Sequence, residues 1–407
     1  MEDRKQVTNT RQIIGLILAI SGISCMGIVK VLIGVNTNTL SVIIIISSLL
    51  LTINYEMLRR GRLLMPYSDM GLFTLFSIVS LAYCVLSGSV DPMSHYGIVY
   101  QVFYFVQIVA VWNLQEIDER KFTKLFFWFE AIANLLAAYV VLTNYMRTGI
   151  LFFNNLGNDT INRSTVGALS FTLVCALLVY PAENQAEKAI KVIMWGVGFF
   201  NLTTSSRRTV ILSLILVVIL HLRNQRIGIE KRTFIKILLG LIVIVPAIIL
   251  AFNRISVLKD MLDHTLKFLN SGINTMLGRS QEDMSAIYRR NSMGVLLQEY
   301  LHESSFMQIV FGRGYMKGWV DLPYLQAFYD MGIIGGVLFI TAHMIIPIKY
   351  LVKRVDNPGF RIAQYLVGLQ FVENFVSGTP YGELFPLVLF AVFQRSVQNA
   401  AVESKEY

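Results

Sequence analysis

The sequence predicts an all-α, polytopic integral membrane protein with about twelve transmembrane helices and one large extracytoplasmic loop. Charged residues make up only 15% of the chain and hydrophobic residues 55%, whereas soluble domains carry about 25% charged residues. Apolar runs recur from near the N-terminus almost to the C-terminus, and most are close to the roughly 20 residues that span a bilayer. The Lys and Arg residues alternate in density between these runs. No polar linker divides the 407 residues, so we expect one integrated membrane domain.

The apolar runs define the predicted helices. The first run, Ile13 to Val35, is too long for a signal-peptide core and lacks a small-residue cleavage site, so it is interpreted as a retained membrane helix. The seventh and eighth helices are short and nearly contiguous, which predicts a tight hairpin or one tilted or broken helix. The expected ranges are 12–34, 39–58, 70–88, 96–113, 122–146, 164–181, 190–203, 207–222, 233–252, 323–349, 361–378 and 383–397.

The distribution of basic residues predicts the topology. With the N-terminus placed in the cytoplasm, the inner segments hold most of the chain's 35 Lys and Arg residues. The short outer connections hold only Arg147, Arg163, Arg207 and Arg208. Short cytoplasmic loops are enriched in Lys and Arg, and this alternation runs through every segment. We therefore expect an even number of spans and two cytoplasmic termini. The net charge of +9 fits this topology, and no nucleic-acid-binding motif accompanies it.

Three segments follow from this map. Residues 1–252 hold nine helices, 253–322 form the large extracytoplasmic loop, and 323–407 hold three helices and a cytoplasmic C-terminus. Within the loop, Ser280 followed by Gln281-Glu282-Asp283 predicts a helix N-cap with an acidic first turn. Mixed apolar and charged residues continue this short helix to about Tyr300. Two glycines in Phe311-Gly312-Arg313-Gly314-Tyr315 then predict a turn.

Several kinds of chemistry have no sequence signal. The chain has no phosphate loop, no nucleophile elbow and no His, Cys and Asp spacing typical of a metal site. Its three cysteines lie inside apolar runs without paired spacing. We therefore expect no metal, nucleotide or other cofactor.

Arginines on the outer side stand out, because topology disfavours them there. Arg207 and Arg208 lie at the outer mouth of a predicted helix, Arg163 at another, and Arg289 and Arg290 in the loop helix. The guanidinium group is a planar fork of donors that matches phosphate oxygens and stays charged. Several converging arginines would suit a diphosphate group. The alternative is that they anchor lipid headgroups or are ordinary solvated charges.

Polar residues also occur inside predicted spans. Glu130, His343, Glu373 and Asn374 lie in apolar helices. An ionised group at the bilayer centre costs about 3 kcal/mol on insertion scales, so such groups usually face the bundle interior or a cavity. Glu373 and Asn374 either line a substrate cavity or form helix–helix hydrogen bonds. His343 is expected to be structural.

One stretch of the chain resembles a known family. Residues 311–315, Phe-Gly-Arg-Gly-Tyr, and 321–335, which include Tyr324-Leu325-Gln326, resemble the end of the periplasmic loop and the following helix in the O-antigen polymerase and ligase superfamily. Ser205-Ser206-Arg207 before a helix is similar to that family's Ser-Arg motif, and Arg289/Arg290 to its loop arginine. The layout resembles the family over the whole chain, and the specific motifs cover about 160–335.

The resemblance implies glycosyl transfer, without metal, at the outer face of the bacterial cytoplasmic membrane. A glycan would move from a polyprenyl diphosphate to the sugar hydroxyl of a lipid-linked acceptor repeat, to build capsule, exopolysaccharide or O-antigen. Arg207 and Arg290 would bind the diphosphate leaving group and stabilise its charge. The resemblance also implies that Arg208, Arg289 and Arg163 bind the substrate, and Tyr324 and the intramembrane Glu373 are further expected substrate-binding residues. Membrane lipid and a chain-length-regulating copolymerase are the implied partners.

One departure separates polymerase from ligase. Ligases place a His-Asn pair shortly before the Leu-Gln that corresponds to Leu325-Gln326, and here the position holds Asp321. Asp321 is expected to act as the catalytic base or to orient the acceptor, or else to cap the helix before Pro323. The departure favours the polymerase. A ligase, a flippase or other transporter, and a receptor remain alternatives, although a receptor gives no reason for outer arginines.

Overall fold

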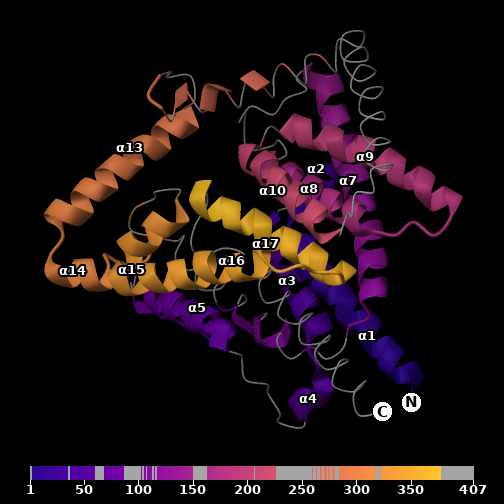
Figure 1. The fold of residues 1–407 in the computed structure, drawn as a ribbon, viewed down its shortest axis with the longest axis horizontal. Coiled ribbons are helices and arrows are strands. Elements are labelled where there is room, and N and C mark those ends of the chain that lie inside the picture. Colours follow the sequence, from indigo (N-terminus) through magenta and orange to yellow (C-terminus); the bar gives the residue numbers. More distant parts are fainter. Residues whose placement is uncertain are drawn as a thin grey trace.

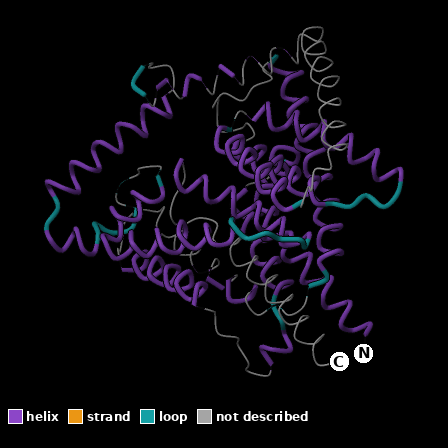
Figure 2. Tube along the Cα trace, in the orientation of Figure 1, coloured by secondary structure: helices purple, strands orange, loops and turns teal. Residues whose placement is uncertain are grey.

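The computed structural model is helical throughout the part that it describes. Every element in that part is a helix, and Figure 2 shows no strand there. The prediction of an all-α chain is confirmed for these residues. They are 2–34, 37–59, 68–86, 102, 105–106, 108–111, 114, 117–149, 163–205, 207–225, 259, 263, 266–267, 270–272, 274–275, 277–279, 284–316, 318 and 322–376.

Most of the predicted spans are present as helices. In the N-terminal part these are α1 (Glu2–Ile17), η1 (Leu18–Gly22), α2 (Ile23–Ile33), α3 (Thr37–Thr52), α4 (Tyr55–Arg59), α5 (Ser68–Leu86), α7 (Glu119–Thr148), α8 (Arg163–Val179), α9 (Gln185–Ser205) and α10 (Arg208–Asn224). In the C-terminal part, the predicted loop holds α13 (Met284–Gln298), η2 (Glu299–Glu303) and α14 (Phe306–Phe311), and the predicted spans are present as α15 (Pro323–Ile340), η3 (Thr341–Ile345), α16 (Ile346–Leu351) and α17 (Pro358–Val376). The predicted helices 233–252 and 383–397 lie outside the described residues, as do most of 96–113 and the predicted cap at Ser280.

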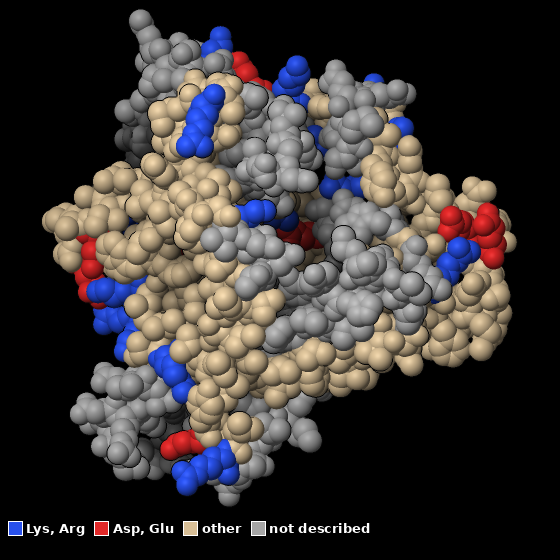
Figure 3. Space-filling view, turned by 180° about the vertical axis from the view of Figure 1, so that it is seen from behind, with Lys and Arg blue, Asp and Glu red and all other residues tan. Residues whose placement is uncertain are grey.

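Among the residues that the structure describes, three helices are long and apolar enough to cross a membrane, namely Thr10–Ile33, Glu119–Thr148 and Pro323–Leu351. Shorter apolar helices lie at Leu40–Thr52, Gly71–Leu86 and Arg163–Val179. Figure 3 shows broad areas of the described surface without a charged side chain. These features indicate association with a membrane, while the count of twelve spans stays a prediction.

The ends of α7 show why apolar runs underestimate helix length. The helix was expected at 122–146 but extends over Glu119–Thr148. Asp118 caps its start, because its side chain accepts a hydrogen bond from the Lys121 backbone N–H at 3.0 Å. Gly149 ends the helix with φ of 70°, a left-handed conformation that suits glycine. Both end signals are polar or small residues outside the apolar run.

The seventh and eighth predicted helices are two separate helices, and α10 packs against α17 and α8 rather than pairing with α9 in a hairpin (Figure 1). Helix α9 ends at Ser205, Arg207 is extended at φ −92° and ψ 107°, and α10 begins at Arg208. Arg207, which directly precedes α10, therefore lies where α8, α10 and α17 meet.

Helix α8 lies at the centre of this arrangement. Its residues 169–177 are all buried, and it packs against α7, α9, α17, α2 and α10. A helix that is apolar on every side is expected to be buried on every side. The N-terminal ends of α8 and α10 both lie near the end of α17, and this end of the bundle holds the predicted outer arginines.

Glu130 makes helix–helix hydrogen bonds in the bundle interior, as expected of a carboxyl group in an apolar span. It is fully buried on α7, and its carboxylate accepts hydrogen bonds from Ser21 of η1 and, at 2.6 Å, from Thr172 of α8. One turn further, the Asn134 side chain donates to the Leu169 carbonyl at 2.8 Å and accepts from Asn201 of α9 at 3.1 Å. These bonds join α7, α8, α9 and η1 through their polar groups.

The predicted helix 323–349 is present but broken, which the sequence pattern did not predict. Within α15, Gly332 has φ 66° and ψ −163°, a conformation outside the helical region. The Gly312 backbone lies directly against the Asp330 carbonyl and Gly332, so that no Cβ fits at either glycine. Backbone N–H groups of Arg313 and Gly314 donate to the carbonyls of Tyr329 at 2.9 Å and Asp330 at 3.0 Å. The turn therefore supplies donors to carbonyls that the break leaves without helical partners.

Side chains fix the same junction. The Asp330 carboxylate accepts hydrogen bonds from the Met316 backbone N–H at 3.1 Å and from Gln326 Nε2 at 2.9 Å. Gln326 also donates to the Gly318 carbonyl at 2.6 Å, and both side chains are buried. The turn predicted at 312–315 is confirmed, and its glycines serve to dock the loop on the broken helix.

Candidate functional site

Arg207 is the residue on which the candidate site is centred. Its guanidinium Nη2 donates to Glu373 Oε1 of α17 at 2.5 Å, and Nη1 donates to the Ser164 carbonyl of α8 at 3.3 Å. The two side chains of the ion pair are 23% and 19% exposed, so solvent still reaches them. The side chain of Arg207 runs past Gly167, where an added Cβ would come within 3.2 Å of it. Close packing therefore fixes the guanidinium at the meeting point of three helices.

The structure places the predicted residues Arg207 and Glu373 in contact, and Arg163 lies next to the α8 residue that Arg207 contacts. Arg163 is the first residue of α8 and directly precedes Ser164, whose carbonyl Arg207 contacts. Arg207 is the N-cap of α10. The N-terminal ends of α8 and α10 carry partial positive charge, which adds to the charge of the arginines. This end of the bundle is thus suited to an anion.

Arg208 lies against the large loop. Its guanidinium packs on the backbone of Gly272 so closely that an added Cβ would overlap it. Gly272 is buried and lies in a helical turn, two residues before Asn274 and three before Thr275. The loop therefore returns to the membrane helices at the predicted site, a contact that no sequence motif indicated.

Arg290 contacts the same loop turn from α13. Its Nη1 donates to the Thr275 carbonyl at 3.4 Å and lies beside Gly278, which has φ of 74°. Arg208 and Arg290 thus touch residues only a few positions apart in the chain. Arg289 is the preceding residue of α13 and is partly buried. The structure therefore links two of the predicted diphosphate-binding arginines through one short turn.

Thr275 is a further polar group at this turn that sequence reasoning missed. It is fully buried, and its hydroxyl has no hydrogen-bond partner among the described residues. A buried hydroxyl without a partner costs about 1–3 kcal/mol. A single threonine in a polar loop carries no pattern that predicts burial.

Of the remaining predicted residues, Tyr324 lies on α15, Glu373 and Asn374 on α17, and His343 on η3. The Tyr324 ring is 6.4 Å from the Phe375 ring, which places Tyr324 near the end of α17 that carries Glu373. Asn374 donates to the His343 carbonyl at 3.0 Å, so it forms a helix–helix hydrogen bond. His343 is buried among three phenylalanines, in keeping with a structural role. Asp321, the predicted base, lies outside the described residues.

The chemistry that this arrangement can support is anion binding. In the part of the chain that the structure describes, no group of three His, Cys, Asp or Glu side chains is placed to hold a metal ion. Figure 3 shows basic and acidic side chains close together near the middle of one face. Glu373 balances Arg207, while Arg163, Arg208 and Arg290 add further positive charge nearby. A diphosphate with several oxygens could be bound by guanidinium groups from α10 and α13.

We expect Gly272→Ala to weaken binding of inorganic diphosphate to the purified chain by about 10- to 100-fold. The new Cβ would displace the Arg208 guanidinium, and a hydrogen bond to a charged group contributes about 1.5–3 kcal/mol. Titration calorimetry in detergent measures the affinity. Gly196→Ala on α9 is the matched control, because nothing lies within 4 Å of its added Cβ. Unchanged affinity in Gly272→Ala would remove Arg208 from the anion site.

Comparison with known proteins identifies no family for this chain. No protein-family model matches it, and no curated protein matches it. Its function is therefore inferred from its residues and from the geometry of the arginines.

Proposed function

We propose that this chain is a membrane polysaccharide polymerase. It would transfer a polyprenyl-diphosphate-linked glycan onto the sugar hydroxyl of a lipid-linked acceptor repeat at the outer face of the bacterial cytoplasmic membrane. The observation that carries the proposal is the meeting of Arg207 and Arg208 with α8, α17 and the loop turn that Arg290 also contacts. Arg208 and Arg290 thus contact the same loop turn although they are far apart in the sequence.

The reaction needs positive charge at the leaving diphosphate, and arginines supply it. The acceptor hydroxyl oxygen forms a bond to the anomeric carbon, while the bond from that carbon to the diphosphate oxygen breaks. The polyprenyl diphosphate leaves with the electron pair, and the hydroxyl proton passes to a base, for which we propose Asp321. Guanidinium groups placed at the leaving oxygens stabilise the charge that develops there. Glu373 holds Arg207 in position before the diphosphate arrives.

The proposed topology has twelve spans and two cytoplasmic termini. Contacts between basic residues and segments distant in the sequence support this topology, because both partners of each contact lie in or next to connections that are assigned to the same side of the membrane. Lys124 lies 3.5 Å from Glu183, and Arg223 donates to the Lys353 carbonyl at 2.6 Å. All four residues lie in or next to connections assigned to the cytoplasmic side. The arginines of the candidate site lie in connections assigned to the opposite side.

Glycan chain length tests the proposal in cells. In a strain that lacks the gene, we expect single exported repeats and no long chains, and the wild-type gene should restore a ladder of chain lengths. Gel electrophoresis of surface glycan measures this. A wild-type gene that leaves chain length unchanged would contradict the polymerase. Restored attachment of preformed long chains would instead indicate a ligase.

A lipid-linked oligosaccharide transporter is the second candidate. Broken membrane helices often form substrate sites in transporters, and α15 is broken at Gly332. The docked turn, however, occupies the backbone groups of this break, which favours a structural role. The two candidates differ in the mutant strain, because loss of a flippase would leave lipid-linked repeats on the cytoplasmic side.

A further inference from the structure

The short helix α14 presents large apolar side chains outward. Phe306 is 77% exposed, Met307 63% and Phe311 46%, and Leu301 just before the helix is 63% exposed. Single exposed apolar residues are common on protein surfaces, but a contiguous group of large ones marks an interaction site. These four residues lie within eleven positions of the loop and form what we call the α14 apolar face.

The helix that carries this face is firmly held at its start. The Ser305 hydroxyl accepts a hydrogen bond from the Gln308 backbone N–H at 3.3 Å, and the Gln308 side chain accepts one from the Ser305 N–H at 2.9 Å. This reciprocal capping box satisfies two of the free donors at the helix start.

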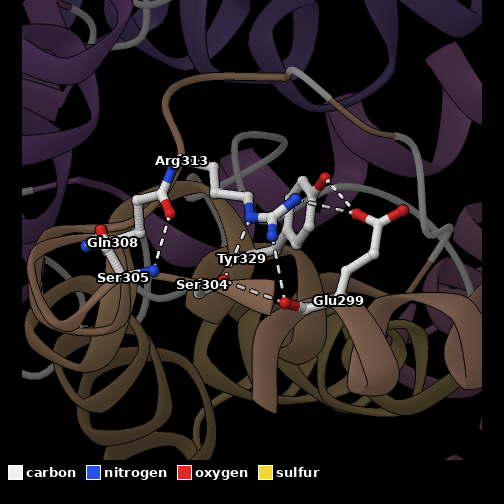
Figure 4. A network of polar contacts seen from close by, with 6 residues as sticks. All are labelled: Glu299, Ser304, Ser305, Gln308, Arg313 and Tyr329. Atoms are coloured by element: carbon white, nitrogen blue, oxygen red, sulfur yellow. Dashed lines mark hydrogen bonds and ion pairs between the residues drawn. The ribbon is translucent and has the colours of Figure 1, made fainter. Parts of the chain in front are cut away.

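A network after the helix holds it against α15 (Figure 4). The Arg313 guanidinium donates to Glu299 Oε2 at 3.0 Å, to the Glu299 carbonyl at 3.0 Å and to the Ser304 hydroxyl at 3.1 Å. The Tyr329 hydroxyl of α15 donates to the same Glu299 carboxylate at 3.0 Å. The apolar side chains of α14 are therefore displayed by a fixed element.

The docking point on α15 sets the depth of α14 relative to a membrane. The candidate span Pro323–Leu351 has 29 residues, about 43 Å of helix against a hydrocarbon core of about 30 Å. The turn after α14 packs on Gly332, nine residues into the span and about 14 Å along it. If the span is centred, about 6–7 Å of helix lies outside the hydrocarbon at each end. Gly332 then lies about 7 Å inside the hydrocarbon boundary.

The surface of α15 next to this point is also apolar. Ile333 and Ile334 directly follow Gly332 and are 45% and 48% exposed, and Val337 one turn later is 53% exposed. In a helix that spans a membrane, such side chains face lipid. The α14 apolar face therefore adjoins a lipid-facing surface.

We propose that α14 is an interfacial membrane helix whose Phe306, Met307 and Phe311 side chains insert at the boundary between lipid headgroups and acyl chains. Apolar faces of interfacial helices enter about 5–10 Å into this boundary, which matches the depth of the docking point. The proposal rests on the apolar span Pro323–Leu351 and not on the polymerase reaction. Its consequence is that the large loop is attached to the bilayer surface as well as to the bundle.

Spin labelling of the full-length chain in vesicles of phosphatidylethanolamine and phosphatidylglycerol tests the proposal. Met307→Cys carries a nitroxide, in a background in which Cys25, Cys84 and Cys175 are replaced by Ala. Collisions with oxygen, which concentrates in lipid, are compared with collisions with a water-soluble nickel complex. Val337→Cys is the lipid-facing reference, and Arg120→Cys, whose native side chain is 79% exposed, is the aqueous one.

We expect the oxygen-to-nickel ratio at residue 307 to be several-fold above that at 120 and close to that at 337. A ratio like that at 120 would overturn the proposal, because the helix would then face water. Low collision rates with both reagents would also overturn it, because they would indicate cover by protein, such as a second copy. On the unmodified chain, a lipid-soluble carbene probe should label residues 306–311, and absence of label there would overturn it independently of any variant.

Discussion

Replacing Arg207 by Ala is expected to lower the rate of glycan polymerisation by about 100- to 1,000-fold, the usual cost of removing one group that stabilises developing negative charge. In the structure its guanidinium is fixed by Glu373 and the Ser164 carbonyl at the meeting of α8, α10 and α17. The loss should appear in the rate at saturating substrate, because the charge develops in the transition state. Initial rates with a purified lipid-linked repeat measure it.

Two variants separate charge stabilisation from a structural role of the same ion pair. Glu373→Gln removes the carboxylate but keeps a hydrogen-bonding side chain of similar size, and we expect it to retain much more activity than Arg207→Ala. Arg147→Ala is the matched control, because Arg147 is an exposed arginine in the last turn of α7 and is also predicted to be outer. Equal losses of activity in Glu373→Gln and Arg207→Ala, at equal thermal stability, would contradict a separate charge-stabilising role of Arg207 and would indicate that the ion pair acts only in packing.

Gly332→Ala is expected to destabilise the folded chain by about 3 kcal/mol or more. A backbone conformation accessible mainly to glycine costs another residue about 1–3 kcal/mol, and the Gly332 angles of 66° and −163° lie in such a region. In addition, the new Cβ would overlap the Val310 carbonyl, because the turn packs directly on the broken helix. We expect a clearly lower Tm and a lower yield of monodisperse protein in detergent.

Gly294→Ala on α13 is the matched control for this prediction. Nothing lies within 4 Å of its added Cβ, and alanine is favoured over glycine inside a helix by about 1 kcal/mol. We expect its Tm to be unchanged or slightly raised. A Gly332→Ala chain with the Tm of wild type would mean that the turn does not dock on the helix break.

The helices could be predicted from the sequence because apolar length is a local property. Helix α8 was expected at 164–181 and extends over Arg163–Val179. The boundary between α9 and α10 lies at the polar residues between two apolar runs. Helix ends such as those of α7 were less accurate, because a capping Asp or a terminal Gly lies outside the apolar pattern.

The break in α15 could not be predicted in this way. Gly332 lies in an apolar run, where a glycine is ordinarily compatible with a membrane helix. Its conformation depends on Gly312, twenty residues earlier, and on the loop hydrogen bonds to Tyr329 and Asp330. Such a conformation results from tertiary packing and leaves no periodic signal in the sequence.

The sequence singled out the arginines of the candidate site, but it did not indicate which side chains they contact. Arginines in connections predicted to be outer stood out because the predicted topology disfavours them there, and the structure brings Arg207 and Glu373 together across 166 positions. The partner of Arg207 was not predictable, since two alternatives for Glu373 fitted its sequence equally well. The contact of Arg208 with Gly272 was missed, because a glycine in a long loop has no side chain that would suggest a role.

Reconstitution of the purified chain tests the central claim most directly. The protein would be placed in phospholipid vesicles with a defined polyprenyl-diphosphate-linked repeat, and mass spectrometry would follow the glycan length and the free polyprenyl diphosphate. The account predicts lipid-linked products of two or more repeats, one polyprenyl diphosphate released for each new linkage, and loss of both in Arg207→Ala. Repeats that cross the bilayer without any new linkage would contradict the polymerase and favour a transporter.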